Sequence, residues 1–244
     1  MTLSKVKFKR SWPALGTWVT LQLEDLDSER VGPVAESFRD ELFRLQKIFN
    51  FHDPESELNR RASENELSPE LGRARELANQ LQELSQGAFT ARRGDRWDFG
   101  GLAKGLIVDL LCEFLESRQQ DLRGSVNAGG DLRFLGVGEW SASLRLGSPE
   151  KPSLQHVALG QRTLATSCLS AKSWSPESST VYWGTAKGFD SVVVVSPECA
   201  WSDGLTKVAL FAERDPVIRV CEAFNAAVFC FDGEGQLVAS RGAL

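Results

Sequence analysis

The chain has 244 residues, of which 42% are hydrophobic and 25% are charged, so it can bury one large core. Its formal net charge of -5 at pH 7 argues against general electrostatic binding to DNA, RNA or anionic membranes, because such binding needs clustered lysines and arginines. We therefore expect one folded domain, residues 1–244, with no nucleic-acid partner.

Cysteine usage and the amino-terminal stretch indicate where the protein would reside. The five cysteines are odd in number and show no CxxC spacing, which favours neither a disulfide framework nor a zinc site. The stretch MTLSKVKFKRSWPALGT has basic residues but no apolar core of signal-peptide length and no lipid-anchoring cysteine. No later run reaches the roughly 20 apolar residues that span a bilayer. The sequence therefore predicts a soluble, cytoplasmic protein.

The first half of the chain predicts one strand and then mostly helices. Residues 18–23 alternate in polarity like a half-buried strand, and residues 34–49 carry apolar side chains at helical spacing. A turn at residues 52–54 leads into a short helix near residues 56–58. Further helices are expected at residues 69–84, closed by Gly87, and at residues 102–118.

The second half predicts strands separated by glycine, proline and serine. The expected strands are residues 125–127, 132–135, 141–146, 156–159 and 191–195. A helix is expected at residues 203–211, with Ser202 or Asp203 as its cap. Residues 227–231 and 236–240 are typical of a closing hairpin around the turn at 232–235. The whole pattern predicts an α+β fold.

The stretch WDFGGLAKGLIVD, residues 97–109, combines the features of an anion site. Gly100 and Gly101 let backbone amides approach an anion, the start of the helix adds a positive field, and Lys104 adds a charge. The spacing matches neither GxGxxG nor the P-loop frame. Phosphate binding and a tight turn packed on a sheet both remain open on these residues alone.

The segment NAGGD, residues 127–131, is a second turn that allows close approach. Gly129 and Gly130 stand beside an amide, Asn127, and a carboxylate, Asp131. Taken alone, it favours a hairpin corner in which Asp131 caps its own turn. Two such turns in one chain favour a shared ligand in a cleft between them.

Seven blocks, in order over nearly the whole chain, resemble the FAD:protein FMN transferases, the ApbE-like family. These blocks are ALGT (14–17), FHDPESELNR (51–60), GAF (87–89), DFGGLAKGLIVD (98–109), VNAGGDLRFLG (126–136), ATS (165–167) and SDGLTKVAL (202–210). The lysine-glycine and NAGGD blocks are the specific ones. The resemblance implies a single α+β domain with a ligand cleft between two lobes.

The resemblance also implies an activity. Members bind FAD, use Mg²⁺ to polarise its pyrophosphate, and pass FMN to a threonine hydroxyl of an acceptor protein with release of AMP; some hydrolyse FAD instead. By motif, Lys104 faces the nucleotide, and Asp203 is the metal ligand. The residues implied to contact the nucleotide are Leu15, Gly16, Thr17, Gly101, Lys104, Asn127, Gly129, Gly130, Asp131, Thr166 and Ser167.

One departure from the family pattern concerns the metal. In the family the metal aspartate is followed four residues later by a threonine that helps to hold the metal, whereas here Lys207 takes that position. An ammonium has only donors and cannot ligate Mg²⁺. Either the charge of Lys207 replaces the electrostatic role of the metal, or Lys207 points to solvent. Asp203 and Lys207 are the candidate catalytic residues.

Other departures weaken the catalytic expectation. The family segment resembling HxxDPxTG has no histidine in residues 179–188, and the chain's histidines, His52 and His156, favour surface and structural roles. A usual insertion between Phe89 and Trp97 is missing. Trp174, Trp183 and Trp201 fall near the cleft blocks, although packing is favoured for each.

Two functions remain: an FMN transferase-like enzyme, and a catalytically degenerate flavin-nucleotide binder or scaffold.

Overall fold

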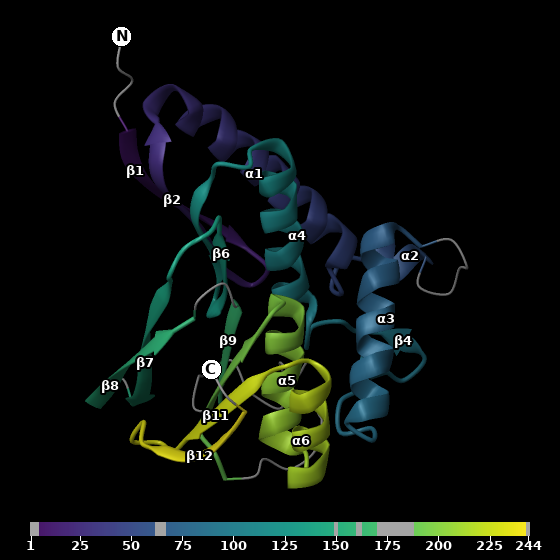
Figure 1. Cartoon of the computed structure of the whole chain (residues 1–244). Helices are drawn as coiled ribbons and strands as arrows, with labels where there is room; N and C mark the ends of the chain where they lie inside the picture. Colours follow the sequence, from purple (N-terminus) through teal and green to yellow (C-terminus); the bar gives the residue numbers. More distant parts are fainter. Residues whose placement is uncertain (1–4, 62–66, 149–150, 160–162, 170–187, 243–244) are drawn as a thin grey trace.

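The computed structural model describes residues 5–61, 67–148, 151–159, 163–169 and 188–242, and its centre is one antiparallel sheet (Figure 1). The strands of this sheet are β1 (Lys5–Ala14), β2 (Thr17–Asp27), β5 (Arg123–Ala128), β6 (Asp131–Leu135), β9 (Thr163–Cys168), β10 (Ser191–Ser196), β11 (Ala227–Phe231) and β12 (Leu237–Arg241). They lie side by side in the order β1-β2-β5-β6-β9-β10-β11-β12. Every neighbouring pair is antiparallel. In this order, β6 and β9 are the two central strands.

Helices and a hairpin cover opposite faces of this sheet (Figure 1). The helices are α1 (Ser28–Phe49), α2 (Glu57–Arg61), α3 (Pro69–Leu84), α4 (Ala103–Arg118), α5 (Cys199–Phe211) and α6 (Arg214–Ala223). The hairpin consists of β7 (Ser141–Ser148) and β8 (Lys151–Ala158), and a shorter hairpin of β3 (Arg92–Arg93) and β4 (Arg96–Trp97) precedes α4. The described chain is thus a mixed α+β fold, which confirms the predicted class.

Strand β10 shows why both faces are covered. Its sequence SVVVVS is buried throughout, and successive side chains of a strand point to opposite faces. Val192 and Val194 belong to the core beneath the helices, whereas Val193 and Val195 pack with Leu144 of the β7–β8 hairpin. Apolar burial on both sides therefore fixes the position of β10 within the sheet.

The predicted elements are mostly present, and local signals explain the best agreement. Helix α3 has the predicted bounds because Ser68 caps it: the Leu71 amide donates to Ser68 Oγ at 3.3 Å, and Pro69 follows. The sequence reasoning missed β1, β9, α6 and the short β3–β4 hairpin. In α6 the buried side chains are only Val220 and Cys221, so its apolar stripe is too short to read from spacing.

The predicted cap of α5 is wrong. The helix begins at Cys199, so Ser202 and Asp203 lie inside it, and both are fully buried. A carboxylate from another helix replaces the local cap: Asp109 accepts the amide hydrogens of Cys199 and Ala200 at 3.1 and 2.9 Å. All residues of α5 are buried, so this helix is an interior element, and its polar side chains must find partners there.

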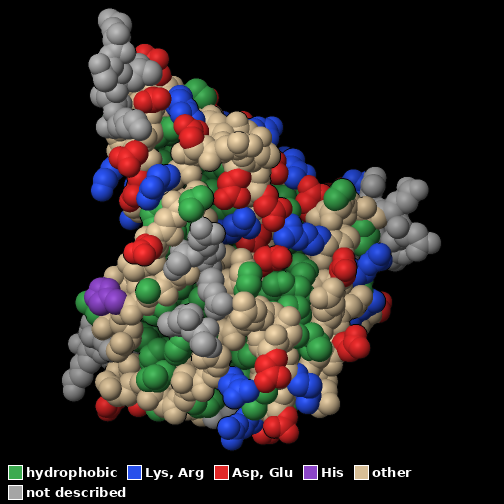
Figure 2. All heavy atoms as spheres, viewed as in Figure 1, with side chains coloured by type: hydrophobic (Ala, Val, Ile, Leu, Met, Phe, Trp, Pro, Cys, Tyr) green, Lys and Arg blue, Asp and Glu red, His purple; other side chains and the backbone are tan. Residues whose placement is uncertain are grey.

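The surface carries both signs of charge. On the face drawn in Figure 2, lysine and arginine side chains alternate with aspartate and glutamate, so no single basic patch covers this face. Within the described ranges, no helix combines the length and the apolarity needed to cross a membrane.

Candidate functional site

The turn between β5 and β6 is held between two threonines. Gly129 and Gly130 have φ angles of 63° and 106°, which favour glycine. A Cβ atom on Gly129 would lie 2.6 Å from Thr17 Oγ1, and one on Gly130 would lie 2.3 Å from Thr166 Oγ1. The Gly130 amide also donates to Asn127 Oδ1 at 3.3 Å. The structure therefore brings five predicted nucleotide residues together at one turn.

Lys104 and Asp131 form an ion pair beside this turn. Lys104 Nζ lies 2.5 Å from Asp131 Oδ2; the Asp131 side chain is buried, and about a third of the Lys104 side chain is exposed. Asp131 Oδ1 is buried and has no hydrogen-bond partner among the described residues. Burial, together with the charge of Asp203, raises the pKa of Asp131 to about 6, although Lys104 and Lys207 oppose the shift.

A second ion pair lies within α5, between Asp203 and Lys207. Lys207 Nζ contacts Asp203 Oδ1 and also donates to the Asp203 carbonyl at 3.0 Å, while Asp203 Oδ2 accepts the Gly105 amide hydrogen at 3.1 Å. The Lys207 side chain is only 7% exposed, so the alternative that it points to solvent is wrong. Burial alone raises the pKa of Asp203, but the charges of Lys104 and Lys207 lower it below the ordinary value.

The two ion pairs are neighbours because α4 and α5 pack tightly. A Cβ atom on Gly105 would lie 2.3 Å from the Cys199 carbonyl oxygen and 2.8 Å from Asp203 Cβ, so only glycine allows this approach. Burial alone lowers the pKa of Lys104, but the charges of Asp131 and Asp203 raise it overall, which keeps its ammonium protonated. Lys104, Asp131, Asp203 and Lys207, here called the charged cluster, thus interact as one group.

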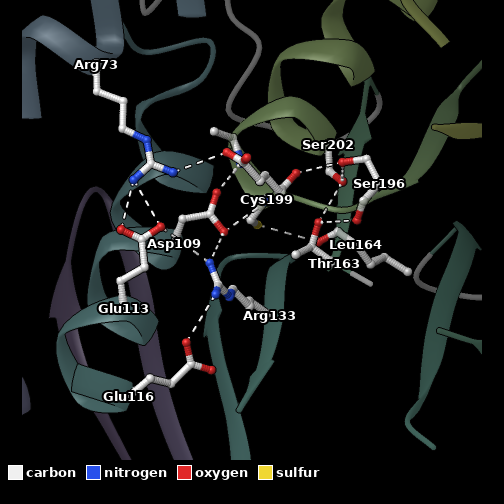
Figure 3. Close-up of polar contacts among 12 residues, drawn as sticks. Arg73, Asp109, Glu113, Glu116, Arg133, Thr163, Leu164, Ser196, Cys199 and Ser202 are labelled. Carbon is white, nitrogen blue, oxygen red and sulfur yellow. Dashed lines mark hydrogen bonds and ion pairs between the residues drawn. The ribbon is translucent and has the colours of Figure 1, made fainter. Parts of the chain in front are cut away.

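Asp109 fixes the start of α5 from the middle of α4 (Figure 3). Its carboxylate receives two amide hydrogens of α5 and also Arg133 Nη1 at 3.0 Å. Arg133 of β6 reaches further to Glu116 at 3.2 Å. Burial raises the pKa of Asp109, and Arg133 with the two amides offsets part of that shift. These contacts therefore fix β6, α4 and α5 relative to one another next to the charged cluster.

Hydroxyl contacts tie β9 and β10 to α5 (Figure 3 shows the first two). Ser202 Oγ lies 3.0 Å from Thr163 Oγ1 and 2.8 Å from Ser196 Oγ. Ser167 Oγ lies 2.7 Å from Thr206 Oγ1, one residue before Lys207. These bonds satisfy the buried polar side chains of α5 and connect Ser167, a predicted nucleotide residue, to the helix of the charged cluster.

A cavity of about 250 Å³ lies between the β5–β6 turn, β9 and the β7–β8 hairpin. Four predicted nucleotide residues line it, namely Asn127, Gly130, Thr166 and Ser167. Pockets for small molecules usually measure about 300–1,000 Å³, so this one is sized for a part of a dinucleotide. A second cavity, of about 580 Å³, lies against α6 and β12, and none of the predicted site residues lines it.

The remaining predicted nucleotide residues lie at two nearby turns. Leu15 and Gly16 form the β1–β2 turn with φ angles of 55° and 70°, and the Leu15 amide donates to Gln46 Oε1 at 2.8 Å. Gly101 is buried just before α4, where Asp98 Oδ1 accepts the Gly100 amide hydrogen at 2.9 Å. Asp98 Oδ2 is buried without a partner in the described part of the chain.

The described histidine and tryptophan candidates, His52, His156 and Trp201, occupy surface or core positions. His52 and His156 are both exposed, and His156 Nδ1 lies 3.0 Å from Ser143 Oγ. Trp201 is buried and stacks on Phe224, with ring centroids 3.6 Å apart, so it packs the core. Trp174, Trp183 and nearly all of the segment 179–188 lie outside the described residues.

The charged cluster does not fit a magnesium ion. Mg²⁺ requires near-octahedral oxygen ligands at about 2.0–2.1 Å. Asp203, the predicted ligand, already bonds the Lys207 ammonium with one oxygen atom and the Gly105 amide with the other. Among the described residues no group of three or more histidine, cysteine, aspartate or glutamate side chains could hold a metal ion. An ion beside Asp203 would have to displace Lys207.

Sequence reasoning assigned no role to Asp109 and left the position of Lys207 open. The spacing of Asp203 and Lys207, four residues apart in an expected helix, is a signal for an intrahelical ion pair. Asp109 stands in the quoted block, but its partners Cys199 and Ala200 lie about ninety positions further along. No local pattern predicts that contact.

The fold and site define an α+β protein with a charged cluster and with a glycine turn that lines a cavity, and sequence comparison supplies the family. The ApbE family model matches residues 90–230, more than half of the chain, so the chain belongs to the ApbE family. Among curated protein sequences, no relative matches it.

Solved structures of the same fold cover nearly the whole chain. The ApbE protein of Thermotoga maritima superposes with a TM-score of 0.76 at 19% identity, over 96% of each chain. The flavin transferase ApbE of Vibrio cholerae gives a TM-score of 0.74 at 16% identity, over 98% of this chain and 97% of that one. The apo flavinyl transferase ApbE of Pseudomonas stutzeri gives 0.73 at 15% identity, over 99% and 96%. At these identities the likeness shows the fold.

Proposed function

We propose that this protein binds FAD and transfers its FMN part to a threonine hydroxyl of an acceptor protein, releasing AMP. The observation that carries the proposal is the convergence of Lys104, Asp131 and the Gly129–Gly130 turn beside a cavity lined by Thr166 and Ser167. Membership of the ApbE family and the fold of named flavin transferases support it.

Each part of the site has a task in this reaction. Lys104 is the partly exposed cation of the site, so it binds a phosphate of the nucleotide, and the glycine turn allows the backbone to approach closely. Thr166 and Ser167 line the cavity and hold the nucleotide by their hydroxyl groups. The positions of these groups are set before the ligand binds, because α4, α5 and the sheet are locked together.

The transfer itself replaces the phosphoanhydride bond between the FMN and AMP parts of FAD by a phosphoester bond to the acceptor. The acceptor hydroxyl oxygen attacks the phosphorus of the FMN part, the bond to the AMP phosphate breaks, and AMP leaves with the bonding electron pair. The hydroxyl proton passes to a base. Asp131 is the candidate base, since its Oδ1 atom has no partner among the described residues and its pKa is raised to about 6.

Magnesium assistance was implied by the family resemblance, and we derive no step through it because the Asp203 carboxylate is already bonded to Lys207. The same observation favours a second candidate function, a flavin-nucleotide binder without transferase activity. The two functions share the nucleotide site and differ in turnover. Release of AMP therefore separates them.

The test is isothermal titration of the full chain with FAD, with released AMP and FMN measured in the same samples. We expect saturable binding and AMP release, and a Lys104→Ala variant that binds FAD more weakly by about 1–3 kcal/mol, the worth of a charge-assisted phosphate contact. Lys7→Ala is the matched control, because Lys7 is exposed on the edge strand β1.

Each outcome assigns a function or removes one. Binding with AMP release supports the transferase, and binding without AMP release supports the flavin-nucleotide binder. No FAD binding by the folded wild-type protein rejects both. Equal FAD affinities of Lys104→Ala and wild type would remove Lys104 from the site.

A further inference from the structure

Lys207 is held where a cation beside Asp203 would lie. Residues four positions apart on α5 face the same side of the helix, and Lys207 Nζ contacts both the carboxylate and the backbone carbonyl of Asp203. Two oxygen atoms of one residue therefore surround one ammonium group. This is the oxygen environment that a bound cation would use.

The Lys207 ammonium keeps one hydrogen-bond donor for a ligand. An ammonium group has three donors, and the contacts to Asp203 use two of them. No further acceptor contacts Nζ among the described residues. Because the side chain is only 7% exposed, a remaining donor is costly unless an acceptor meets it.

The surroundings of Lys207 include the second cation of the charged cluster, Lys104. Its charge interacts with Asp131, the ion-pair partner of Lys104, so the two lysines flank the same buried carboxylates. Thr206, the preceding residue on α5, bonds to Ser167, which lines the 250 Å³ cavity. The two ammonium groups thus come from two helices, α4 and α5, and interact with the same two buried carboxylates, Asp131 and Asp203.

We propose that Lys207 is the built-in cation of the nucleotide site, so that this protein binds the phosphates of a flavin nucleotide without a divalent metal ion. The proposal rests on the proposed function and adds how the charge of the phosphates is neutralised. Asp203 acts here as a positioning residue, because it holds the Lys207 ammonium in place.

A lysine in place of a metal ion changes both the net charge beside Asp203 and the chemistry available to the phosphates. Asp203 with a divalent ion would carry a net charge of +1, whereas Asp203 with Lys207 is neutral. The lysine therefore offers a donor and a local positive potential, but no Lewis acid to polarise the pyrophosphate. We expect metal-independent binding combined with AMP release that chelators leave unchanged.

The first experiment titrates the folded full chain with Mn²⁺ alone and follows free Mn²⁺ by electron paramagnetic resonance. The wild type should show no specific Mn²⁺ binding. Lys207→Thr replaces the ammonium by an oxygen ligand and opens Asp203, so it should bind Mn²⁺ at least about tenfold more tightly than the wild type. Lys7→Thr, at an exposed lysine, is the matched control and should behave as the wild type. Specific binding by the wild type that Lys207→Thr does not strengthen would overturn the proposal.

A double variant guards against misfolding. Lys207→Thr leaves the Asp203 carboxylate buried without its cation, which can unfold the chain. Asp203→Asn combined with Lys207→Met removes both charges while keeping the volumes, and it should fold. It should bind FAD about tenfold more weakly than wild type, because one phosphate donor is lost. Wild-type FAD affinity in this variant would overturn the proposal.

The second experiment measures FAD binding to the wild type with excess Mg²⁺ and with a chelator. Equal affinities support the built-in cation, and a loss of about tenfold or more with the chelator would overturn it. If FAD binds under neither condition, the proposed function fails, and the Mn²⁺ titration alone then decides whether Lys207 fills the cation position. The two failures are therefore distinguishable.

Discussion

Replacing Asp109 by alanine should destabilise the protein strongly, because this carboxylate joins three elements. It receives two amide hydrogens at the start of α5 and the guanidinium of Arg133. The loss of a helix cap costs about 0.5–2 kcal/mol, and a buried charge that loses its partner adds to this. Arg133 retains Glu116 at 3.2 Å, which limits the second loss. We expect the free energy of unfolding to fall by about 2–4 kcal/mol.

The assay is urea unfolding followed by tryptophan fluorescence and circular dichroism. Asp109→Asn keeps an oxygen acceptor for one amide, so it should lose only about half as much stability as Asp109→Ala. Asp40→Ala, at an exposed carboxylate of α1, should stay within about 0.5 kcal/mol of wild type. A loss below about 1 kcal/mol in Asp109→Ala would refute the view that Asp109 anchors α5.

Two further predictions concern the turn and the pH. Gly130→Ala should weaken FAD binding at least about tenfold in isothermal titration, because its φ of 106° and the 2.3 Å approach to Thr166 Oγ1 force the turn to move; an unchanged affinity would count against the turn as part of the site. FAD affinity should rise as the pH falls through about 6, because Asp131 then takes up a proton and no longer neutralises Lys104. Because the pKa of Asp131 is raised, the free energy of unfolding should fall as the pH rises from 3.8 to about 6. Asp131→Asn should remove the pH dependence of both the FAD affinity and the folding stability. An FAD affinity that does not change with pH in the wild type would contradict the pairing of Lys104 with Asp131.

Local signals explain which elements the sequence predicts well. Helix α3 carries its own cap and an initial proline, and strand β11 is an apolar run before a glycine-rich turn, so both have the expected bounds. Strand β1 lies at the edge of the sheet and ends at Pro13–Ala14. Its more buried residues Val6, Phe8, Trp12 and Ala14 alternate with exposed positions, so a strand signal was present in the sequence and was overlooked.

The sequence predicted the residue types of the candidate site, but it did not predict the contacts between segments that are distant in sequence. The glycine turns and Lys104 carry residue types that indicate an anion site, and the structure brings them together. The start of α5 was misplaced because its cap comes from Asp109, which is distant in sequence. Whether Lys207 meets solvent or Asp203 depends on the burial of α5, and spacing alone leaves this open. The domain bounds 1–244 and the individual nucleotide contacts stay predictions.

A crystal structure of the full chain with FAD, grown with Mn²⁺ present, tests the central claim most directly. The account predicts a phosphate within hydrogen-bond distance of Lys104 Nζ, close to the Gly129–Gly130 turn, with Lys207 still bonded to Asp203 and no anomalous metal signal beside that carboxylate. FAD bound away from Lys104 and this turn would contradict the proposed nucleotide site. A manganese ion in the place of the Lys207 ammonium would contradict the built-in cation.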